Sequence, residues 1–344
     1  MKHIPLISFL TLLLFSPTAF AGDPFFRSER IFEPSAERPA NHSSSIVVLN
    51  DGTLAATWFG GSKEGLPDVG IWLSRRPAGS DEWTPPVEII DDPEYAEGNS
   101  VLYEDRDGLL HIFYLVKYEE RWDAWESSRI FERTSGDGGA SWSAPRLLSD
   151  DMGIAIHHNI VELTDGKLLL PVYEEIPPQC AAWISADGFT TWEEHRVPLT
   201  EPGSSQPDVV LLDDGSLVMF ARHHGFPGRI WMTVSGDGGA TWREPKKTKL
   251  KNPDSGLAAV SPDGKTIVLA FNDNAYVRTP LSLAFSADGG RTWSRAKPIE
   301  TDSQEFSYPY LVAAPDGTIH LTYTAENRKT IKHAEFNLEW LARE

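Results

Sequence analysis

The chain has 344 residues and a formal net charge of −19, with 40% hydrophobic and 24% charged residues. A surface this acidic argues against nucleic-acid binding, which requires basic patches to neutralise phosphate. The single cysteine, Cys180, excludes an internal disulfide framework, and no neighbouring motif would activate it as a nucleophile. The length is enough for two average domains, although a single propeller or barrel can also absorb it.

The first 21 residues, MKHIPLISFLTLLLFSPTAFA, have the pattern of a secretory signal. Lys2 gives a positive start, an apolar run follows, and small residues stand at Ala19 and Ala21. The apolar run is shorter than the roughly 20 residues that cross a bilayer. We therefore expect cleavage after Ala21 and a mature chain of residues 22–344 in the periplasm or outside the cell. We also expect that mature chain to be a monomer that is not bound to a membrane.

Two repeat signals follow along the chain in phase with each other. The segment SxDGxxxW begins at Ser135, Ser185, Ser235 and Ser286, and its tryptophans are 50, 50 and 51 residues apart. Asp-Gly pairs between alternating apolar runs begin at Asp51, Asp107, Asp165, Asp214, Asp263 and Asp316. Asp-Gly in this setting is a strong hairpin signal, because glycine accepts the positive φ of a tight turn.

Six units of about 50 residues, each with four antiparallel strands, predict an all-β, six-bladed β-propeller. In the fourth unit the expected strands are residues 207–212, 216–222, 229–235 and 246–249. The last unit lacks a good fourth strand, so we expect residues 28–32 to supply it and to close the ring. A β-sandwich is the alternative fold, but it does not explain regular spacing over six units.

The SxDGxxxW segment, known as an Asp box, has a structural interpretation. Its Ser and Asp side chains can bond backbone groups of the turn, its Gly takes a left-handed conformation, and its Trp packs under the hairpin. We expect these residues on the rim of the propeller, away from any ligand. Phe189 replaces a glycine in the second copy, which predicts strain in that turn and an intact blade.

Polar residues occupy one repeated position, eight residues before each Asp-Gly aspartate. They are Ser43, Asn99, His157, Gln206, Ser255 and Tyr308. Because this position begins the innermost strand of each blade, we expect a polar ring around one end of the central channel. Convergent polar groups in a concave site are typical of ligand binding, although they could also line a water-filled pore.

Charged loops are expected to project around the same end of the channel. Arg222 stands where other units have mostly aromatic or apolar residues, and Arg229 and Arg278 end loops of the fourth and fifth units. Several arginines directed at one funnel indicate recognition of a carboxylate, because a guanidinium pairs with it through two hydrogen bonds. The long second-unit loop carries Trp122 and Trp125, which could stack on a sugar ring or pack the loop onto the body.

The chain resembles the sialidase (neuraminidase) superfamily, in particular bacterial Asp-box sialidase-like proteins, over about residues 30–335. The resemblance is carried by the Asp boxes, by NHSSSIVVLNDGTLAATWFGG and GLPDVGIWLSRR in the first unit, by Arg222, and by SYPYLVAAPDGTIHLTY near the end. It implies a glycosidase that holds its substrate's carboxylate with three arginines. It also implies an aspartate acid/base and a tyrosine nucleophile assisted by a glutamate, a recognised exception among glycosidases.

The resemblance implies roles for individual residues of this chain. Asp68 falls at the acid/base position, Tyr308 at the nucleophile, and Arg222 and Arg278 at the second and third arginines. Two positions depart from the family pattern.

The first expected arginine is replaced by His42, and the expected glutamate by Gln206. Gln206 can hydrogen-bond a phenol but cannot take its proton. We count His42 and Gln206 among the candidate catalytic residues, and Arg229, Asn99 and His157 among the candidate substrate-binding residues.

Three functions remain open at this point. The first is hydrolysis of a glycan at an acidic sugar, either a sialic acid or a uronic acid. The second is a polysaccharide lyase, in which His42 or His157 abstracts the proton next to a uronate carboxylate and Tyr308 protonates the leaving oxygen. The third is glycan binding without catalysis. We expect a carbohydrate partner, no cofactor, and no metal ligands, since His157–His158 and His223–His224 lack partners at ligand spacing.

Overall fold

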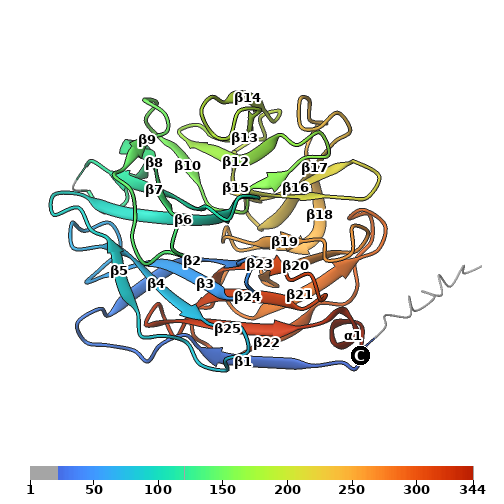
Figure 1. Ribbon diagram of the computed structural model, residues 1–344. Coiled ribbons are helices and arrows are strands. Elements are labelled where there is room, and N and C mark those ends of the chain that lie inside the picture. Colours follow the sequence, from blue (N-terminus) through green and yellow to red (C-terminus); the bar gives the residue numbers. More distant parts are fainter. Residues whose placement is uncertain (1–21, 120, 344) are drawn as a thin grey trace, which may run out of the picture.

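The computed structural model describes residues 22–119 and 121–343, which form six antiparallel sheets around a common centre (Figure 1). Each sheet is one blade, so the chain is a six-bladed β-propeller, as predicted. The predicted signal, residues 1–21, lies outside the described residues. In the part of the chain that is described, no helix has the length and apolar character needed to cross a membrane.

Each blade has four strand positions, numbered here from the centre outward. The innermost strands are β2 (Ala40–Val48), β6 (Ala96–Glu104), β10 (Ile154–Ile156) with β11 (Val161–Glu162), β15 (Ser204–Leu211), β19 (Ala258–Val260) and β23 (Ser307–Ala313). The second strands are β3 (Leu54–Gly61), β7 (Leu110–Lys117), β12 (Leu168–Glu175), β16 (Leu217–His223), β20 (Ile267–Asn272) and β24 (Ile319–Ala325).

The two outer positions complete the sheets. The third strands are β4 (Gly70–Arg76), β8 (Ser128–Ser135), β13 (Pro178–Ser185), β17 (Arg229–Ser235), β21 (Leu281–Ser286) and β25 (Thr330–Phe336). The fourth strands are β5 (Val87–Ile90), β9 (Arg146–Leu147), β14 (Glu193–Arg196), β18 (Lys246–Lys251), β22 (Lys297–Glu300) and β1 (Phe26–Arg30). A 3₁₀ turn, η1 (Trp125–Ser127), and a short helix, α1 (Leu338–Ala342), are the helical elements within the described ranges.

The outer strand of the sixth blade comes from the opposite end of the chain. Strand β1 pairs antiparallel with β25, with Ser28 opposite Ala334 and Arg30 opposite Lys332. It begins two residues before the segment expected from the sequence and ends two residues before that segment ends. The sheet order β1-β25-β24-β23 therefore joins the N-terminal and C-terminal parts of the ring.

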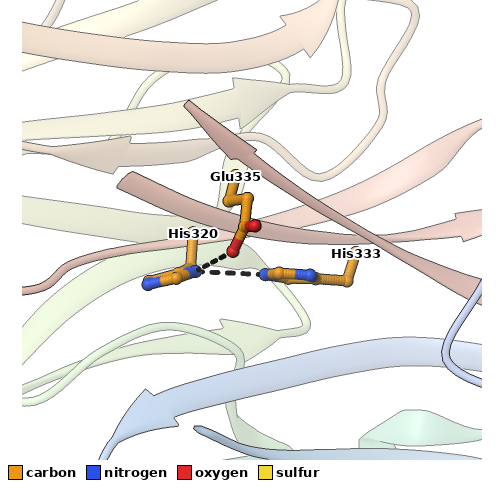
Figure 2. Close-up of side chains that lie close together, drawn as sticks. All are labelled: His320, His333 and Glu335. Carbon is orange, nitrogen blue, oxygen red and sulfur yellow. Dashed lines mark hydrogen bonds and ion pairs between the residues drawn. The ribbon is translucent and has the colours of Figure 1, made fainter. Parts of the chain in front are cut away.

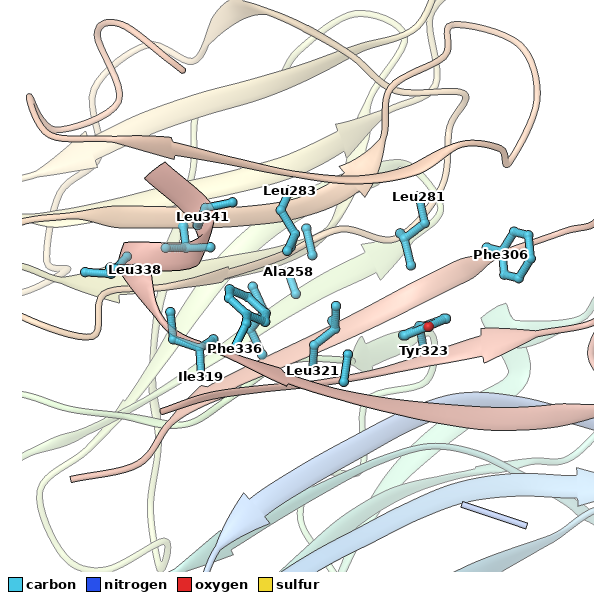
Figure 3. Packing of buried hydrophobic residues seen from close by; sticks show 14 of the residues in the cluster. Ala258, Leu281, Leu283, Phe306, Ile319, Leu321, Tyr323, Phe336, Leu338 and Leu341 are labelled. Atoms are coloured by element: carbon cyan, nitrogen blue, oxygen red, sulfur yellow. The ribbon is translucent and has the colours of Figure 1, made fainter. Parts of the chain in front are cut away.

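Apolar side chains fill the interfaces between neighbouring blades. Each of the six buried clusters contains residues from two adjacent sheets of the described structure. Figure 3 shows the cluster between the fifth and sixth blades, where Leu283 of β21 faces Leu321 of β24 and Phe336 of β25. Helix α1 adds Leu338 and Leu341 to the same cluster. The blades are thus held together mainly by packing of one sheet against the next.

The Asp boxes stabilise turns between the third and fourth strands. In the first copy, Ser135 Oγ donates to Asp137 Oδ1 at 2.7 Å and accepts from the Gly139 amide at 2.7 Å. Asp137 also accepts from the Ser141 amide at 2.9 Å and from its hydroxyl at 2.6 Å. The other three copies repeat the Ser–Asp bond and the bonds from the last Thr of the box. These side chains therefore hydrogen-bond to one another and to backbone amides of their own turn.

Phe189 occupies a position that requires a left-handed backbone. Its φ is 70°, where the first Asp box has Gly139 with a φ of 86°. Its side chain is nevertheless 2% exposed and packs edge-to-face against Tyr103 and Phe113, with ring centroids 5.6 and 5.2 Å away. Aromatic packing between the second and third blades therefore offsets the strain of the turn.

We expect Phe189→Gly to lower the free energy of unfolding by about 2 kcal/mol. The substitution removes a left-handed strain of about 1–2 kcal/mol but loses a buried aromatic side chain, a change that costs about 3–5 kcal/mol. Urea denaturation of both proteins measures the difference. A variant more stable than the wild type would show that strain outweighs packing at Phe189.

Candidate active site

A polar ring is formed where the inner strands bend. Four inner strands have a β-bulge near their first end, and a non-glycine residue with positive φ lies in each: Ser43 (54°), Asn99 (33°), Gln206 (51°) and Tyr308 (51°). In the third blade the inner strand is interrupted between β10 and β11, and His157 lies in the gap. A bulge leaves one residue unpaired and redirects its side chain. These five residues are five of the six polar positions predicted from the repeat.

The fifth blade lies against this ring at Gly256, the residue after the predicted polar position Ser255. A Cβ on Gly256 would lie 3.1 Å from His157 Nε2 and 3.3 Å from both Gln206 Oε1 and Tyr308 Cγ. A side chain at this position would therefore make contacts tighter than ordinary van der Waals distances with three members of the ring. The fifth blade contributes backbone, which leaves room for the tyrosine ring.

Tyr308 receives two hydrogen bonds at its phenol oxygen. Arg222 Nη1 lies 3.0 Å from that oxygen, and Gln206 Nε2 lies 3.1 Å from it. The ring of Tyr308 also packs against His42 and His157, with ring centroids 4.1 and 4.8 Å apart. Donors aimed at a phenol oxygen favour negative charge on that oxygen. The arrangement fixes the position of the Tyr308 oxygen at the centre of the polar ring.

Further hydrogen bonds connect the remaining members of the polar ring. Ser43 Oγ donates to Asn99 Oδ1 at 2.7 Å and lies 3.3 Å from His157 Nδ1. The amide of Asn99 reaches the hydroxyl of Tyr173 at 3.5 Å. His42 is held from the sixth blade, since its Nδ1 lies 2.8 Å from Thr324 Oγ1. Residues from the first, second, third and sixth blades therefore fix one another around Tyr308.

Three arginines lie around the polar ring of residues described above. Arg222 bridges Ser205 Oγ at 3.0 Å and Asp254 Oδ1 at 3.3 Å. The guanidinium of Arg278 lies over the Tyr308 ring, with its Cζ 5.4 Å from the centroid. Arg328, in the turn between β24 and β25, adds a third positive charge that acts on Tyr308.

Each arginine is paired with a carboxylate of the protein. Arg278 and Arg328 lie 3.0 and 3.2 Å from Glu305, and Arg328 also contacts Glu64. Arg222 is paired with Asp254 as described above. Three guanidinium groups thus face three carboxylates. A guanidinium has five donors, and the contacts of Arg222 described above use only Nε and Nη1.

The two histidines beside Tyr308 are neutral. Burial lowers the pKa of His42 well below 6.5, and the charges of Arg328 and Arg278 lower it further. Burial, His158 and Arg222 likewise hold the pKa of His157 well below 6.5. A neutral imidazole can accept a proton, whereas an imidazolium cannot.

Two carboxyl groups near Arg222 have pKa values shifted in opposite directions. Burial raises the pKa of Glu175 above its usual value, although Arg222 opposes the change. Burial also acts to raise the pKa of Asp254, but a hydrogen bond from His224 and the charge of Arg222 outweigh it and lower that pKa. Environments that separate two carboxyl pKa values are typical of acid and base pairs. Glu175 is therefore suited to hold a proton, and Asp254 to remain ionised.

Asp68 lies in the loop after β3 and is exposed. Its carboxylate accepts hydrogen bonds from the Ser62 amide at 3.0 Å and from the Ser62 hydroxyl at 2.9 Å. The same loop carries Glu64, which contacts Arg328. This loop thus reaches the arginine side of the polar ring, with Asp68 on its solvent side.

Arg229, predicted to bind substrate, has a backbone contact within its own blade. It begins β17, the third strand of its blade, and its Nη1 donates to the carbonyl of Lys249 in β18 at 2.7 Å. The guanidinium therefore contacts the backbone of the outer strand of its own blade.

The two tryptophans of the second-blade loop differ in their surroundings. Trp125 packs against the body, where a Cβ on Gly98 would lie 2.5 Å from its ring. Trp122 is 51% exposed, and Lys63 Nζ lies 5.3 Å from its ring. Trp122 is the one of this pair that leaves an aromatic face open to a ligand.

Sequence reasoning missed Arg328, Glu305, Asp254 and Glu175. Arg328 and Glu175 lie where second strands end and loops project, a position that drew attention to Arg222 in the fourth unit. The comparison eight residues after each Asp-Gly aspartate gives Tyr173 and Thr324 in the third and sixth units, so it passes over Glu175 and Arg328, which lie two and four residues further on. Glu305 and Asp254 precede inner strands and had no repeated signal.

The sequence profile of the BNR repeat-like domain matches residues 52–321, more than half of the chain. The chain belongs to the BNR repeat-like domain family. Repeats of this family account for the regular spacing of the Asp boxes.

Curated relatives of this BNR-repeat chain include two enzymes named for sialic acid chemistry. A sialidase from Micromonospora viridifaciens is 24% identical over 95% of this chain and 56% of its own length. An anhydrosialidase from Macrobdella decora is 24% identical over 66% of this chain and 33% of its own length. The chain thus spans about half of the first relative and a third of the second.

Solved structures share the fold at low sequence identity. A Hadza microbial sialidase aligns over 91% of this chain and 68% of its own, with a TM-score of 0.78 and 17% identity. The intramolecular trans-sialidase from Ruminococcus gnavus, solved with oseltamivir carboxylate, aligns over 91% and 98%, with a TM-score of 0.74 and 15% identity. A protein of unknown function from Dyadobacter fermentans aligns over 91% and 99%, with a TM-score of 0.76 and 16% identity. The BNR-repeat chain therefore has the sialidase propeller fold.

Proposed function

We propose that the protein is a glycoside hydrolase that acts on an acidic sugar of a glycan, with Tyr308 at its centre. The observation that carries this proposal is the pair of hydrogen bonds from Arg222 and Gln206 to the Tyr308 hydroxyl, inside a ring of polar residues. The names of its relatives, sialidase and anhydrosialidase, support glycan chemistry as the class of reaction. Fold alone does not establish function, so the argument rests on the site.

Tyr308 would act as the nucleophile at the anomeric carbon. Arg222 and Gln206 would stabilise the phenolate oxygen as it forms. Gln206 cannot accept the phenol proton, because its amide has no basic site. The neutral imidazoles of His42 and His157 pack on the tyrosine ring, but their lowered pKa values make them weak bases. We therefore propose that the phenol loses its proton to water, with Arg222 and Gln206 stabilising the phenolate.

The acidic group of the sugar would bind on the arginine side of the ring. Arg222 and Arg278 lie against Tyr308, and Arg328 adds its charge to theirs. Because protein carboxylates already pair with these arginines, we propose that a ligand carboxylate takes their remaining donors. Asn99 would contact a neutral part of the sugar.

We propose Asp68 as the acid that protonates the leaving oxygen. Glu175, whose pKa is raised, is the alternative candidate for this role. On this proposal Asp68→Asn is expected to lower kcat/KM by about 100-fold, within the range of general acid catalysis. Glu175→Gln is the matched control and is expected to change kcat/KM by less than about threefold. The assay should use a glycoside with a poor leaving group, because activated aryl glycosides need little acid assistance. The reverse order of effects would move the acid role to Glu175.

A uronate lyase is the second candidate, and the two neutral histidines beside Tyr308 favour it. In that reaction His42 or His157 would remove the proton next to the carboxylate, and the Tyr308 hydroxyl would protonate the leaving oxygen. Elimination gives an unsaturated sugar that absorbs in the near ultraviolet, whereas hydrolysis does not. A spectrum recorded during incubation with uronate polysaccharides therefore separates the two reactions, and binding without either product would support a non-catalytic glycan-binding protein.

We also propose that the protein is exported and cleaved after Ala21, supported by the composition of the first 21 residues. Mass spectrometry of the N-terminal peptide from cells tests this. A chain that begins at Gly22 is expected, and a chain that retains residues 1–21 would contradict the proposal.

A further inference from the structure

Two histidines and a glutamate converge outside the polar ring, in the sheet that closes the propeller. His320 Nδ1 lies 3.1 Å from His333 Nε2 and 3.8 Å from Glu335 Oε2 (Figure 2). The three ligand atoms all lie within 4.8 Å of one another. His333 is 1% exposed and His320 is 6% exposed, so the group is largely shielded from solvent.

The strand register explains why these side chains meet. His320 of β24 lies directly opposite Glu335 of β25, and His333 precedes Glu335 by two residues on the same strand. Residues two apart on a strand share a face of the sheet. On the next strand, Glu29 of β1 lies opposite His333 and Arg27 lies opposite Glu335. The cluster therefore spans the three strands through which the N-terminal segment is joined to the sixth blade.

We propose that His320, His333 and Glu335 bind a divalent transition-metal ion of the Zn²⁺ type. Imidazole nitrogen bonds Zn²⁺ at about 2.0–2.1 Å, and a tetrahedral arrangement at that length places ligand atoms about 3.3 Å apart. The separations of 3.1 and 3.8 Å lie on either side of that value. Two imidazoles and one carboxylate suit Zn²⁺ and its neighbours, whereas Ca²⁺ and Mg²⁺ prefer oxygen ligands.

The immediate surroundings support His333 as a ligand. Glu29 Oε1 lies 3.6 Å from His333 Nδ1, the nitrogen that faces away from the other two ligands. A carboxylate on the second nitrogen is the usual partner of a metal-binding histidine. A neutral imidazole has one nitrogen lone pair free to bind a metal ion.

Two arginines compete for the carboxylate and set the expected strength of binding. Arg76 Nη2 lies 2.5 Å from Glu335 Oε2, and Arg27 Nη1 lies 3.8 Å from Glu335 Oε1. Arg76 also reaches Glu29 at 3.3 Å. A carboxylate oxygen has two lone pairs, so Oε2 can accept from Arg76 and still bind a metal ion. The positive charges nevertheless weaken attraction of a cation, and we expect moderate rather than very tight affinity.

A bound ion would stabilise the closure of the ring. It would crosslink β24 to β25, the strand that holds β1, and Arg76 and Trp83 of the first blade lie against the same cluster. An ion that binds the folded protein and not the unfolded chain raises stability in proportion to the logarithm of its concentration above Kd.

Titration of the EDTA-treated full chain with Zn²⁺ tests the proposal, using protein without a polyhistidine tag. We expect one equivalent of Zn²⁺ to bind by calorimetry and the Tm to rise with Zn²⁺ concentration. His320→Gln should weaken binding by at least about tenfold. His195→Gln is the control, because His195 lies 3.6 Å from Glu193 but belongs to no three-ligand group among the described residues.

Co²⁺ provides a readout that does not depend on a variant folding. The wild-type chain should give the visible d–d absorption of four-coordinate Co²⁺, and added Zn²⁺ should remove it. Absence of stoichiometric Zn²⁺ binding to the wild type, or equal loss of binding in His320→Gln and His195→Gln, would overturn the proposal.

Discussion

Replacing Tyr308 with phenylalanine is expected to lower kcat/KM on an acidic glycoside by about 1,000-fold. The change removes the oxygen that Arg222 and Gln206 contact and leaves the ring that packs on His42. A nucleophile or a general acid contributes effects of roughly 10²–10⁴. Initial rates at several substrate concentrations measure the change.

Tyr310→Phe is the matched control for this prediction. Tyr310 lies two residues further along β23, is fully buried, and stacks on His158 with ring centroids 5.8 Å apart. The Tyr310→Phe variant also loses a phenol hydroxyl, but not the one that Arg222 and Gln206 contact. We therefore expect its kcat/KM to stay within about twofold of wild type. If Tyr308→Phe keeps more than a tenth of the activity at unchanged Tm, the tyrosine oxygen does not take part in the reaction.

Arg222→Lys is expected to lower kcat/KM by about 100-fold while leaving the protein folded. Arg222 contacts Tyr308, Ser205 and Asp254 at once through a planar fork, and a single ammonium group cannot reproduce that geometry. Loss of one donor to a developing oxyanion costs about 10²–10³ in rate. The charge is retained, so Asp254 keeps a cation nearby. Steady-state kinetics of the purified variant measure the loss.

Arg229→Lys is the control that the structure offers for Arg222. Arg229 belongs to the same blade but faces the outer strand β18. Its substitution should leave kcat/KM within about twofold of wild type. Equal losses in the two variants would mean that general positive charge, and not the contact with Tyr308, explains the effect.

The repeated part of the molecule was accessible from the sequence. The regular spacing of Asp boxes and Asp-Gly turns predicted six blades, and the same alignment brought Ser43, Asn99, His157, Gln206 and Tyr308 to one ring. Each of these predictions needed only a position in the repeat. The bulges that redirect the side chains occur at that repeated position in four blades.

Features that break the repeat were harder to predict. Arg328 reaches the site because the turn between β24 and β25 runs through three residues with positive φ, which no spacing rule indicated. Arg229 was predicted to bind substrate because its loop carries other charged residues, and its contact with the Lys249 carbonyl followed from no feature of the repeat. The sequence also gave no sign of the cluster of His320, His333 and Glu335, since its members meet through strand pairing and not through ligand spacing.

The measurement that tests the central claim most directly is aglycone release from a small panel of aryl glycosides between pH 4 and 8. The panel contains an α-sialoside and its methyl ester, glucuronides of both anomeric configurations, and the corresponding glucosides, in which a hydroxymethyl group replaces the carboxylate. We predict release from at least one acidic glycoside, with kcat/KM at least about tenfold above that of its neutral counterpart, because a buried charged contact is worth more than about 1.4 kcal/mol. Release from the neutral glycosides alone, or from none of the panel, would contradict a hydrolase that recognises an acidic sugar.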